Sequence, residues 1–266
     1  MCLQLAQLDG QPRSWQGTVI SAEQHDSDGG IAHYRLHIGT WLSLLKPRRN
    51  TRIFQDLDAL EIVTRIFADY PQAQWEARVT QLLPRRALCT QYRETDYEFV
   101  CRLLSEAGLS FYFEHAANAK KSARLVIIDR DYPWPDGGTL IFSREDTQQA
   151  DDGIRRLSEQ RQISSETATT CAWNPEQLLG LSGSADDAIS EGPVVPELEV
   201  YEAIACAIFH AQNEAHLAAT HLLSARRLSC HGYEGDSATR PLQLGVRYTL
   251  DHHPQLGALP LVCRQI

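Results

Sequence analysis

The stretch from Gln91 to His115 reads QYRETDYEFVCRLLSEAGLSFYFEH, and its residue order specifies a helix that runs into a strand. Thr95 and Glu98 form a capping box, in which the two side chains bond backbone N–H groups at the start of a helix. Gly108 suits the left-handed residue that ends a helix. The aromatic run after it predicts a strand. The apolar stripe of the helix is Phe99, Leu103 and Ala107, with Val100 and Leu104 beside it.

The segments on either side extend this stretch into a larger unit. Apolar residues recur at helical spacing from Asp56 to Tyr70, and Pro71 ends the helix that they predict. After the motif, strands are expected at Leu109 to Glu114 and at Arg124 to Asp129, joined by the polar turn Ala116 to Lys121. A helix that feeds a hairpin packs naturally as an α+β unit.

The first 45 residues predict a β-hairpin. Its strands are expected at Gly17 to Ala22 and at Ala32 to Ile38, with turn-forming residues from Asp26 to Gly30. One face of the second strand carries Tyr34, Leu36 and Ile38. Because these alternate with polar residues, we expect one face of the hairpin to be buried.

The second half of the chain mixes strands, a loop and a helix. Strands are predicted within Ile154 to Ala172, and Leu178 to Pro196 predicts a long exposed loop because it is rich in Gly, Ser, Asp and Pro. Tyr201 to Arg227 predicts a long helix. The last predicted strands are Arg247 to Leu250 and Leu259 to Val262.

The predicted long helix carries an unusual apolar stripe. Its members are mostly small: Ile204, Ile208, Ala211, Ala215, Ala218 and Leu222. Small side chains let another backbone approach closely. The stripe therefore packs either on its own domain or on another subunit, and the sequence leaves both alternatives open.

The composition narrows the class of protein. Hydrophobic residues make up 43% of the chain, which is enough to fill a core. The net charge of −9 argues against a general nucleic-acid binder, which needs a basic face to meet phosphates. The charge is concentrated: Ser143 to Glu202 holds 13 acidic and 4 basic residues. Such a block is usually a set of solvated loops, the alternative being a face for a basic partner.

The seven cysteines indicate reduced thiols rather than a disulfide framework or a zinc ribbon. They are scattered, odd in number and without a C-x-x-C pair: Cys2, Cys89, Cys101, Cys171, Cys206, Cys230 and Cys263. Cys101 and Cys206 fall in predicted helices and are expected to be small core residues. We expect no membrane-spanning segment, because no run of about 18 apolar residues occurs. We also expect no signal peptide at Met1 to Gln16.

Motifs of enzymes are absent from the sequence. It contains no G-x-S-x-G, Walker loop, G-x-G-x-x-G or H-E-x-x-H pattern. His210 and Glu214 are four apart on the predicted helix and would share a face, but two ligands without a third rarely hold a metal. His252 and His253 are expected at a turn. Carboxylates are abundant, yet nothing selects a catalytic pair. We therefore predict no enzymatic activity, no catalytic residue, no cofactor and no metal.

The motif from Gln91 to His115 resembles the pattern Y-R-E-T-D-x-x-F-x-x-R-L-x-x-E-x-G-x-x-Y-x-F-E-H of VgrG, the spike protein of type VI secretion systems. Baseplate hub proteins of contractile phage tails, including the late control protein D type, share this pattern. Arg52 to Gln55 resembles the family's R-I-F-Q, and Trp41 to Leu45 resembles its P-W-L-x-L-L with Thr40 in place of proline. Gly10 to Gly17 and Leu244 to Leu250 also match.

The resemblance implies structural roles for the motif residues that match. These are Arg52, Phe54, Tyr92, Arg93, Glu94, Thr95, Asp96, Phe99, Arg102, Leu103, Glu106, Gly108 and Phe113. Arg102 and Glu106 are spaced as an i,i+4 ion pair. Arg93 and Glu94 precede the cap and are expected to tie the helix start to a neighbour, so we expect Arg93, Glu94 and Asp96 to hold the architecture together.

The resemblance also implies the fold class: α+β, with mostly β barrel-like hub domains, a small α/β insertion and one long helix at about residues 200–227. It divides the chain into a partial first barrel-like domain (1–48), an α/β middle domain (49–145) and a second barrel-like domain (146–266). Relative to the family, we expect the chain to be shortened at both ends. The family has further strands before the point matching Met1, and an OB-type domain and a β-helical needle beyond Ile266.

The implied function is mechanical. A homotrimer couples a threefold needle to the hexameric tube protein Hcp, contacts other baseplate components, and injects effectors when the sheath contracts. It is assembled in the cytoplasm and becomes extracellular after firing without a signal peptide. Two alternatives stay open: the tail hub of a contractile phage or prophage, and a hydrolase or metal-dependent enzyme on the same fold.

Overall fold

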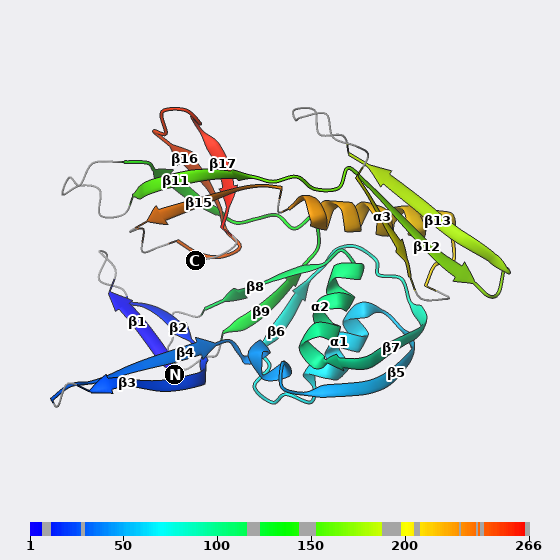
Figure 1. Cartoon of the computed structure of the whole chain (residues 1–266), viewed down its shortest axis with the longest axis horizontal. Helices are drawn as coiled ribbons and strands as arrows, with labels where there is room; N and C mark the ends of the chain where they lie inside the picture. The colour runs from blue at the N-terminus through cyan, green and yellow to red at the C-terminus, as the bar shows by residue number, and fades with distance from the viewer. Residues whose placement is uncertain are drawn as a thin grey trace.

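The computed structural model describes residues 1–6, 12–27, 30–115, 123–143, 153–187, 198–204, 208–228, 230–237, 239 and 242–263. These residues form a strand-rich α+β structure with three α-helices (Figure 1). The strands pair into sheets of two or three, and no closed barrel is seen among the described strands. The predicted α+β class is therefore confirmed in its coarse form. No helix of the described residues is long and apolar enough to span a membrane.

The central unit contains two helices and five strands. Strand β5 pairs antiparallel with β7, and β9 lies between β6, which is parallel to it, and β8, which is antiparallel. A 3₁₀ helix at Trp41–Leu45 leads into the unit. The bounds are β5 (Arg49–Leu57), α1 (Ala59–Phe67), β6 (Trp75–Arg78), β7 (Arg86–Thr95), α2 (Asp96–Glu106), β8 (Ser110–Glu114) and β9 (Arg124–Ile128).

Both helices of the central unit start with a capping box. Asp58 and Glu61 cap α1, and the predicted Thr95–Glu98 box caps α2. The first helix is shorter than the predicted Asp56 to Tyr70, because Asp56 has a φ of 52° and cannot continue a helix. Gly108 has a φ of 67° and ends α2, as predicted.

One core holds the central unit together. Phe99 stacks on Phe54 with ring centroids 5.7 Å apart, and the edge of Trp41 meets Phe67 at 4.9 Å. Trp41 comes from the segment that the sequence placed in the first domain. The fully buried large side chains of this core include Leu45, Ile62, Ile66, Phe67, Phe99, Leu103, Leu104, Leu125 and Ile127.

The N-terminal strands form two separate two-stranded sheets, β1 (Cys2–Ala6) with β2 (Pro12–Gln16) and β3 (Thr18–Ser27) with β4 (Ala32–Gly39). The predicted hairpin is present, but the prediction that one of its faces is buried is wrong. Tyr34 is 65% exposed, and Leu36 and Ile38 are also exposed. Alternation decides which side chains share a face, whereas burial requires a second layer, and none of the described elements covers β4.

The C-terminal half contains three small sheets and one helix. Strand β16 lies between β10 and β17, β11 pairs with β15, and β12 lies between β13 and β14. The bounds are β10 (Asp136–Ile141), β11 (Ile154–Arg161), β12 (Thr167–Asn174), β13 (Leu179–Asp186), β14 (Glu199–Ala203), α3 (Gln212–Arg227), β15 (His231–Ser237), β16 (Arg247–Asp251) and β17 (Leu259–Val262). The strands predicted near residues 154–172, 247–250 and 259–262 are confirmed.

Two predictions in this half are wrong. The exposed loop expected from Leu178 contains β13, which pairs with β12 along its whole length, and residues 188–197 lie outside the described residues. The helix expected from Tyr201 begins only at Gln212. Residues 199–203 instead form a strand parallel to β12. Local propensity favours helix there, but the backbone groups are satisfied by a strand that is 32 residues away in sequence.

Helix α3 packs on its own sheet across β12 and β13. Ala215 and Ala219 are completely buried there. A Cβ added at Gly183 of β13 would overlap the backbone of Ala215 and His216, so the helix approaches the strand as closely as glycine allows. The packing of the small stripe on its own sheet is therefore confirmed for Ala215, and Ala219, which was not predicted as part of the stripe, packs there too. Cys101 is half-buried in α2, and Cys206 lies outside the described residues.

Gly108 offers a test of how α2 meets α3. A Cβ at Gly108 would overlap the imidazole of His221 on α3, whereas Gly138, with a φ of 83°, has open space. Backbone strain alone should make Gly138→Ala lose about 1–2 kcal/mol of unfolding free energy. Gly108→Ala should lose about 1–3 kcal/mol more because of overpacking. Urea unfolding of both variants measures the difference, and equal losses would contradict a tight contact with His221.

Candidate functional site

Asp96 lies at the first position of α2 and is completely buried. Its Oδ1 accepts hydrogen bonds from Gln91 Nε2 at 2.8 Å and Asn50 Nδ2 at 3.0 Å. Its Oδ2 accepts one from the Tyr70 hydroxyl at 2.8 Å and lies 3.3 Å from Arg48 Nε. A buried carboxylate needs such partners, because an unpaired charge in the interior is costly. The Asp96 carboxylate therefore joins α2 to β5, β7 and the segment after α1.

This buried cluster continues to the surface through Asp69. Asp69 Oδ2 accepts from Arg48 Nη2 at 2.6 Å and from Arg52 Nη2 at 2.8 Å. Hydrogen bonds from Arg52 and Arg48 lower the pKa of the Asp69 carboxyl. Burial and the hydrogen bond to Asp96 raise the pKa of Tyr70, so its hydroxyl stays a proton donor. We call these residues the Asp96 cluster: Arg48, Asn50, Arg52, Asp69, Tyr70, Gln91 and Asp96.

A second ionic group lies on the exposed side of α2. Arg102 donates to both carboxylate oxygens of Glu94, at 2.8 and 2.9 Å, and to Glu106 Oε1 at 3.0 Å. The other oxygen of Glu106 accepts from Arg86, which is itself buried. The predicted Arg102–Glu106 pair is present, and Glu94 ties the end of β7 to the helix.

Arg93 occupies a bulge near the end of β7. Its φ is 54°, and it is the extra residue of a bulge, because Asn50 pairs with Glu94 while Thr51 pairs with Tyr92. Its guanidinium stacks over the exposed Tyr92 ring, 5.4 Å from the centroid. Tyr92 and Arg93 are both exposed.

A third polar group fastens the other sheet of the central unit. Arg78 donates to Glu114 Oε1 at 2.7 Å and to the hydroxyls of Tyr112 and Tyr132 at 3.1 Å. Arg124 binds Glu76 at 2.7 Å and Glu114 at 2.9 Å. Burial opposes ionisation of Glu114, but the bonds from Arg78 and Arg124 outweigh it, so its pKa is lowered.

The structure brings most of the sequence-predicted motif residues into one rigid unit around α2. Phe54, Phe99 and Leu103 lie in its core. Phe113 is half-buried, with its ring centroid 6.4 Å from that of Trp41. Sequence reasoning missed four side chains that hold Asp96: Arg48, Asn50, Tyr70 and Gln91. Gln91 is the first residue of the motif, so it is the one partner of Asp96 that the sequence could have indicated. The other three lie 26 to 48 residues away, beyond the reach of local patterns.

The prediction that His210 and Glu214 share one face of a helix is wrong, because His210 precedes α3. The His210 backbone N–H instead donates to Glu214 Oε2 at 2.7 Å. His253 lies at a turn as predicted, with its ring 4.4 Å from that of Phe142. No group of three His, Cys, Asp or Glu residues with metal-binding geometry occurs in the part of the chain that the structure describes.

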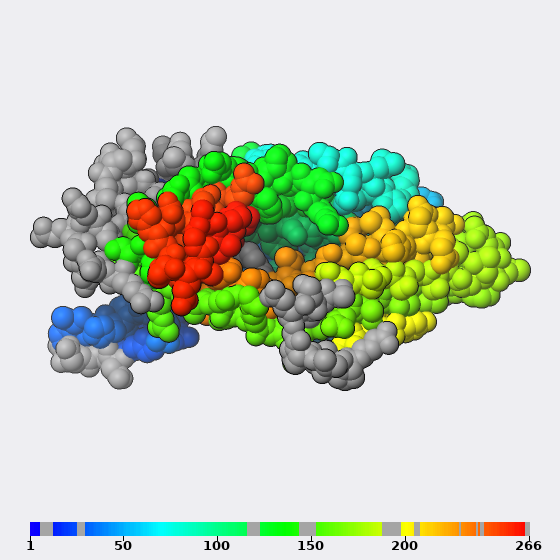
Figure 2. All heavy atoms as spheres, turned by 90° about the horizontal axis from the view of Figure 1, so that it is seen from above, coloured from blue at the N-terminus to red at the C-terminus, as the bar shows by residue number. Residues whose placement is uncertain are grey.

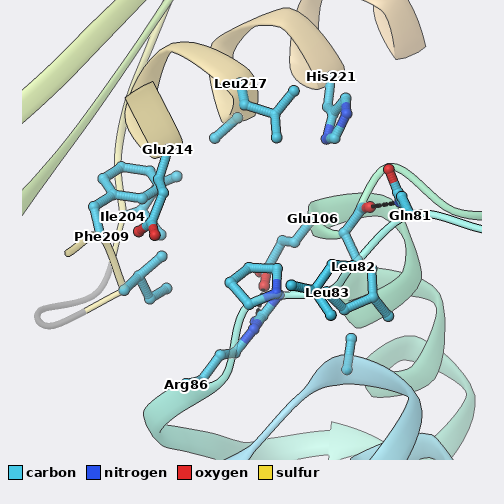
Figure 3. A pocket seen from close by; sticks show the side chains of 15 residues that line it. Gln81, Leu82, Leu83, Arg86, Glu106, Ile204, Phe209, Glu214, Leu217 and His221 are labelled. Atoms are coloured by element: carbon cyan, nitrogen blue, oxygen red, sulfur yellow. Dashed lines mark hydrogen bonds and ion pairs between the residues drawn. The ribbon is translucent and has the colours of Figure 1, made fainter. Parts of the chain in front are cut away.

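A cleft separates the central unit from α3 (Figure 3). Its walls are mainly apolar: Leu82, Leu83 and Pro84 lie on one side, and Phe209 and Leu217 on the other. Two carboxylates line it, but Glu106 is paired with Arg86 and Glu214 accepts the His210 N–H. The imidazole of His221 also lines the cleft, and burial lowers its pKa.

Solved structures with the same fold are tail proteins. A component of the type VI secretion system of E. coli, described as similar to the phage T4 tail proteins gp27 and gp5, aligns with a TM-score of 0.67 at 17% identity. That alignment covers 97% of this chain and 57% of the other. A tail protein of Neisseria meningitidis MC58 also aligns with a TM-score of 0.67, at 15% identity, over 96% of this chain and 74% of that one. The fold is thus shared with these tail proteins.

The chain belongs to the phage tail baseplate hub (GPD) family, whose model matches residues 1–260. Type VI secretion system spike proteins of Pseudomonas aeruginosa are among its relatives. VgrG4b is 30% identical over 196 residues, which are 72% of this chain and 24% of VgrG4b. VgrG1b is 29% identical over 124 residues, which are 47% of this chain and 16% of VgrG1b. The chain thus spans about a quarter or less of the length of these relatives.

Asp129 marks a further buried carboxylate of the central unit. Its Oδ2 accepts from the Thr80 hydroxyl at 2.8 Å, the Gln81 N–H at 3.0 Å and the Thr80 N–H. Burial alone would raise the pKa of Asp129, but these donors outweigh it, so the pKa is lowered. The carboxylate fixes the segment that carries Leu82 at the edge of the cleft.

The Asp96 cluster should be essential to stability. Asp96→Asn removes the buried charge that faces Arg48 and presents an amide to existing donors, so we expect a loss of about 3 kcal/mol of unfolding free energy. Asp69→Asn removes a partner of the same Arg48 at a more exposed position and should cost at most about 1 kcal/mol. Urea unfolding compares the two, and similar losses would contradict a special role for the buried carboxylate.

Asp129 should make stability depend on pH. Because its folded pKa is lowered, its contribution is present above the unfolded value of about 4 and is lost as the pH falls through the folded pKa. Asp129→Asn should therefore be less stable than the wild type at pH 7, by about 1–3 kcal/mol, with a smaller difference at pH 3. Urea unfolding at both pH values measures it. The exposed Asp131→Asn is the control, and a constant gap would refute the assignment.

Proposed function

We propose that the chain is the structural hub body of a type VI secretion spike, which couples a trimeric needle to the hexameric Hcp tube for injection of effectors. The observation that carries this proposal is the family match over residues 1–260. The type VI spike proteins among the relatives support the spike over other hubs.

The saturated polar groups fit a mechanical task. A hub must transmit force between tube and needle without local unfolding. The Asp96 cluster ties several elements together through carboxylates with more than one donor. The polar group of Arg78, Glu114 and Arg124 does the same. Such networks fix relative positions rather than bind substrates. The roles of the motif residues, from Arg52 to Phe113, are on this proposal structural, and the hub cuts no bond.

The proposed organisation follows the family. Residues 1–48 contribute to a first barrel-like domain, residues 49–145 form the α/β middle domain, and residues 146–266 form a second barrel-like domain with α3. Three copies then present six barrel-like domains to a sixfold tube, alongside other baseplate components. The protein assembles in the cytoplasm and leaves the cell when the system fires. The needle and any effector domain belong to the larger remainder of the relatives' length.

The second candidate is a tail hub of a contractile phage or prophage. The likeness of fold to the tail protein of Neisseria meningitidis favours it. The neighbouring genes distinguish the two, because capsid and tail-fibre genes would accompany a phage hub, and sheath and Hcp genes of a secretion system would accompany a spike.

Native mass spectrometry tests the proposed hub. The purified chain should form trimers at micromolar concentration and should bind Hcp hexamers at one trimer per ring, because a threefold assembly of paired domains matches a sixfold ring. A small monomeric protein without ring symmetry is the negative control for binding to the Hcp ring. A chain that stays monomeric and never associates with Hcp would contradict this function for the chain in this form.

A further inference from the structure

Two half-buried histidines lie where other parts of the chain meet the central unit. His115 is the last residue of the motif and follows β8, and His221 lies within α3. In Figures 1 and 2 the N-terminal strands, coloured blue, project at one end of the molecule, and α3, coloured orange, runs alongside the central unit. The two histidines thus belong to two different joints of the central unit.

The first joint contains a hydrogen bond that needs a neutral imidazole. The backbone N–H of Gln16 donates to Nδ1 of His115 at 3.4 Å, across 99 residues of sequence. A ring nitrogen accepts such a bond only while it carries no proton, and both ring nitrogens are donors in the charged form. Because β2 ends at Gln16, this bond fastens the N-terminal strands to the end of β8.

The charged groups around His115 oppose its protonation. Burial is the larger cause and the positive charge of Arg13 on β2 the smaller one, and together they lower the pKa of His115. Arg13 also lies near Tyr248 and Cys263, whose side chains are uncharged at pH 7. Glu114, the neighbour of His115 in sequence, is already bound by Arg78 and Arg124. An imidazolium here would therefore face Arg13, and the adjacent carboxylate is already in use.

The second joint is a close contact between His221 and the end of α2. The ring packs on Gly108, where an added Cβ would overlap the imidazole. Burial, and then the positive charge of Arg130, lower the pKa of His221. The C-terminal end of α2 favours a positive charge. However, the carbonyl of Ala107 there already accepts from Gln81 Nε2 at 3.0 Å.

The other charged groups that line the cleft with His221 are also engaged. Glu106 is bound by Arg86 and by Arg102. Glu214, on the same helix as His221, accepts the backbone N–H of His210 at 2.7 Å. An imidazolium at His221 would therefore gain no free carboxylate and would lie near Arg130.

We propose that the two joints form an acid-sensitive device, in which protonation of His115 releases the N-terminal strands from the central unit and protonation of His221 releases α3. The inference is independent of the proposed hub function. Both joints are closed at neutral pH, when both imidazoles are uncharged.

The sign of the effect follows from proton binding. An open joint leaves its histidine in water, where it takes up a proton at a pH of about 6.5, whereas the closed joint lowers that pKa. The penalty on the closed joint is therefore absent well above pH 6.5 and grows as the pH falls towards the pKa of the closed form. Each histidine raises the ratio of open to closed joints by at most about tenfold per pH unit.

The central unit itself stays folded in this range. The pKa values of Asp129 and Glu114 are lowered from ordinary carboxyl values, so both stay ionised at pH 5 and keep their partners. Opening of the joints is thus separable from acid unfolding of the core.

Small-angle scattering at pH 7.5 and pH 5.0 tests the proposal, with light scattering on the same column to compare species of equal mass. The radius of gyration of the wild type should increase at pH 5.0. His115→Gln and His221→Gln cannot be protonated, and Gln at position 115 still offers an acceptor to Gln16. Each single variant should expand less than the wild type, and the double variant should keep its dimensions. His25→Gln, at an exposed position on β3, is the control and should expand as the wild type does.

Hydrogen exchange at both pH values, corrected for intrinsic rates, separates opening from unfolding. Amides of α1 and α2 should keep their protection at pH 5.0, and Gln16 should lose its protection in the wild type but not in His115→Gln. If a Gln variant does not match the wild-type dimensions at pH 7.5, His115→Asn and His221→Asn replace it. An unchanged wild type at pH 5.0, an equal expansion of the double variant, or loss of protection throughout α1 and α2 would each overturn the inference.

Discussion

Asp96 accepts hydrogen bonds from Gln91, Asn50 and Tyr70 while it faces Arg48, and the central unit is arranged around these contacts. The carboxylate sits in the first turn of α2, where the helix dipole also favours a negative charge. Its partners come from β5, β7 and the turn after α1. Because a buried carboxylate without these donors would be strongly unfavourable, arrangements that separate these elements are disfavoured.

That arrangement explains how a strand-rich chain with small sheets attains a rigid centre. The core of Phe54, Phe99 and Trp41 supplies the apolar burial, and the polar clusters fix the direction in which the elements lie. Arg102 and Arg78 hold the outer faces of α2 and β8 through shared carboxylates. Surface ion pairs alone contribute little, whereas networks with partly buried members resist local opening. The proposed hub would need that resistance to local opening when it transmits force.

The elements outside the central unit are stabilised differently from the centre. The β3–β4 hairpin leaves Tyr34 exposed, and the β12–β13 hairpin leaves Trp173 and Leu178 exposed. Helix α3, in contrast, packs so closely on β13 that only glycine fits at position 183. Ala215 and Ala219 are thus used in packing against this sheet, whereas Ala218 lines the cleft.

The sequence by itself determined the features whose causes lie within a few residues. The Thr95–Glu98 box starts α2, Gly108 ends it, and Arg102 and Glu106 pair one helical turn apart, because cap, stop and pair each depend on neighbours three or four positions away. The family could also be recognised from the sequence, because its longest motif is this local unit of a capped helix and the strand after it. Only the tertiary structure decided that Tyr201 to Ala203 form a strand, that Tyr34 stays exposed and that Tyr70 and Asn50 meet Asp96. Those outcomes depend on which distant segment supplies a partner, and local patterning carries no information about that choice.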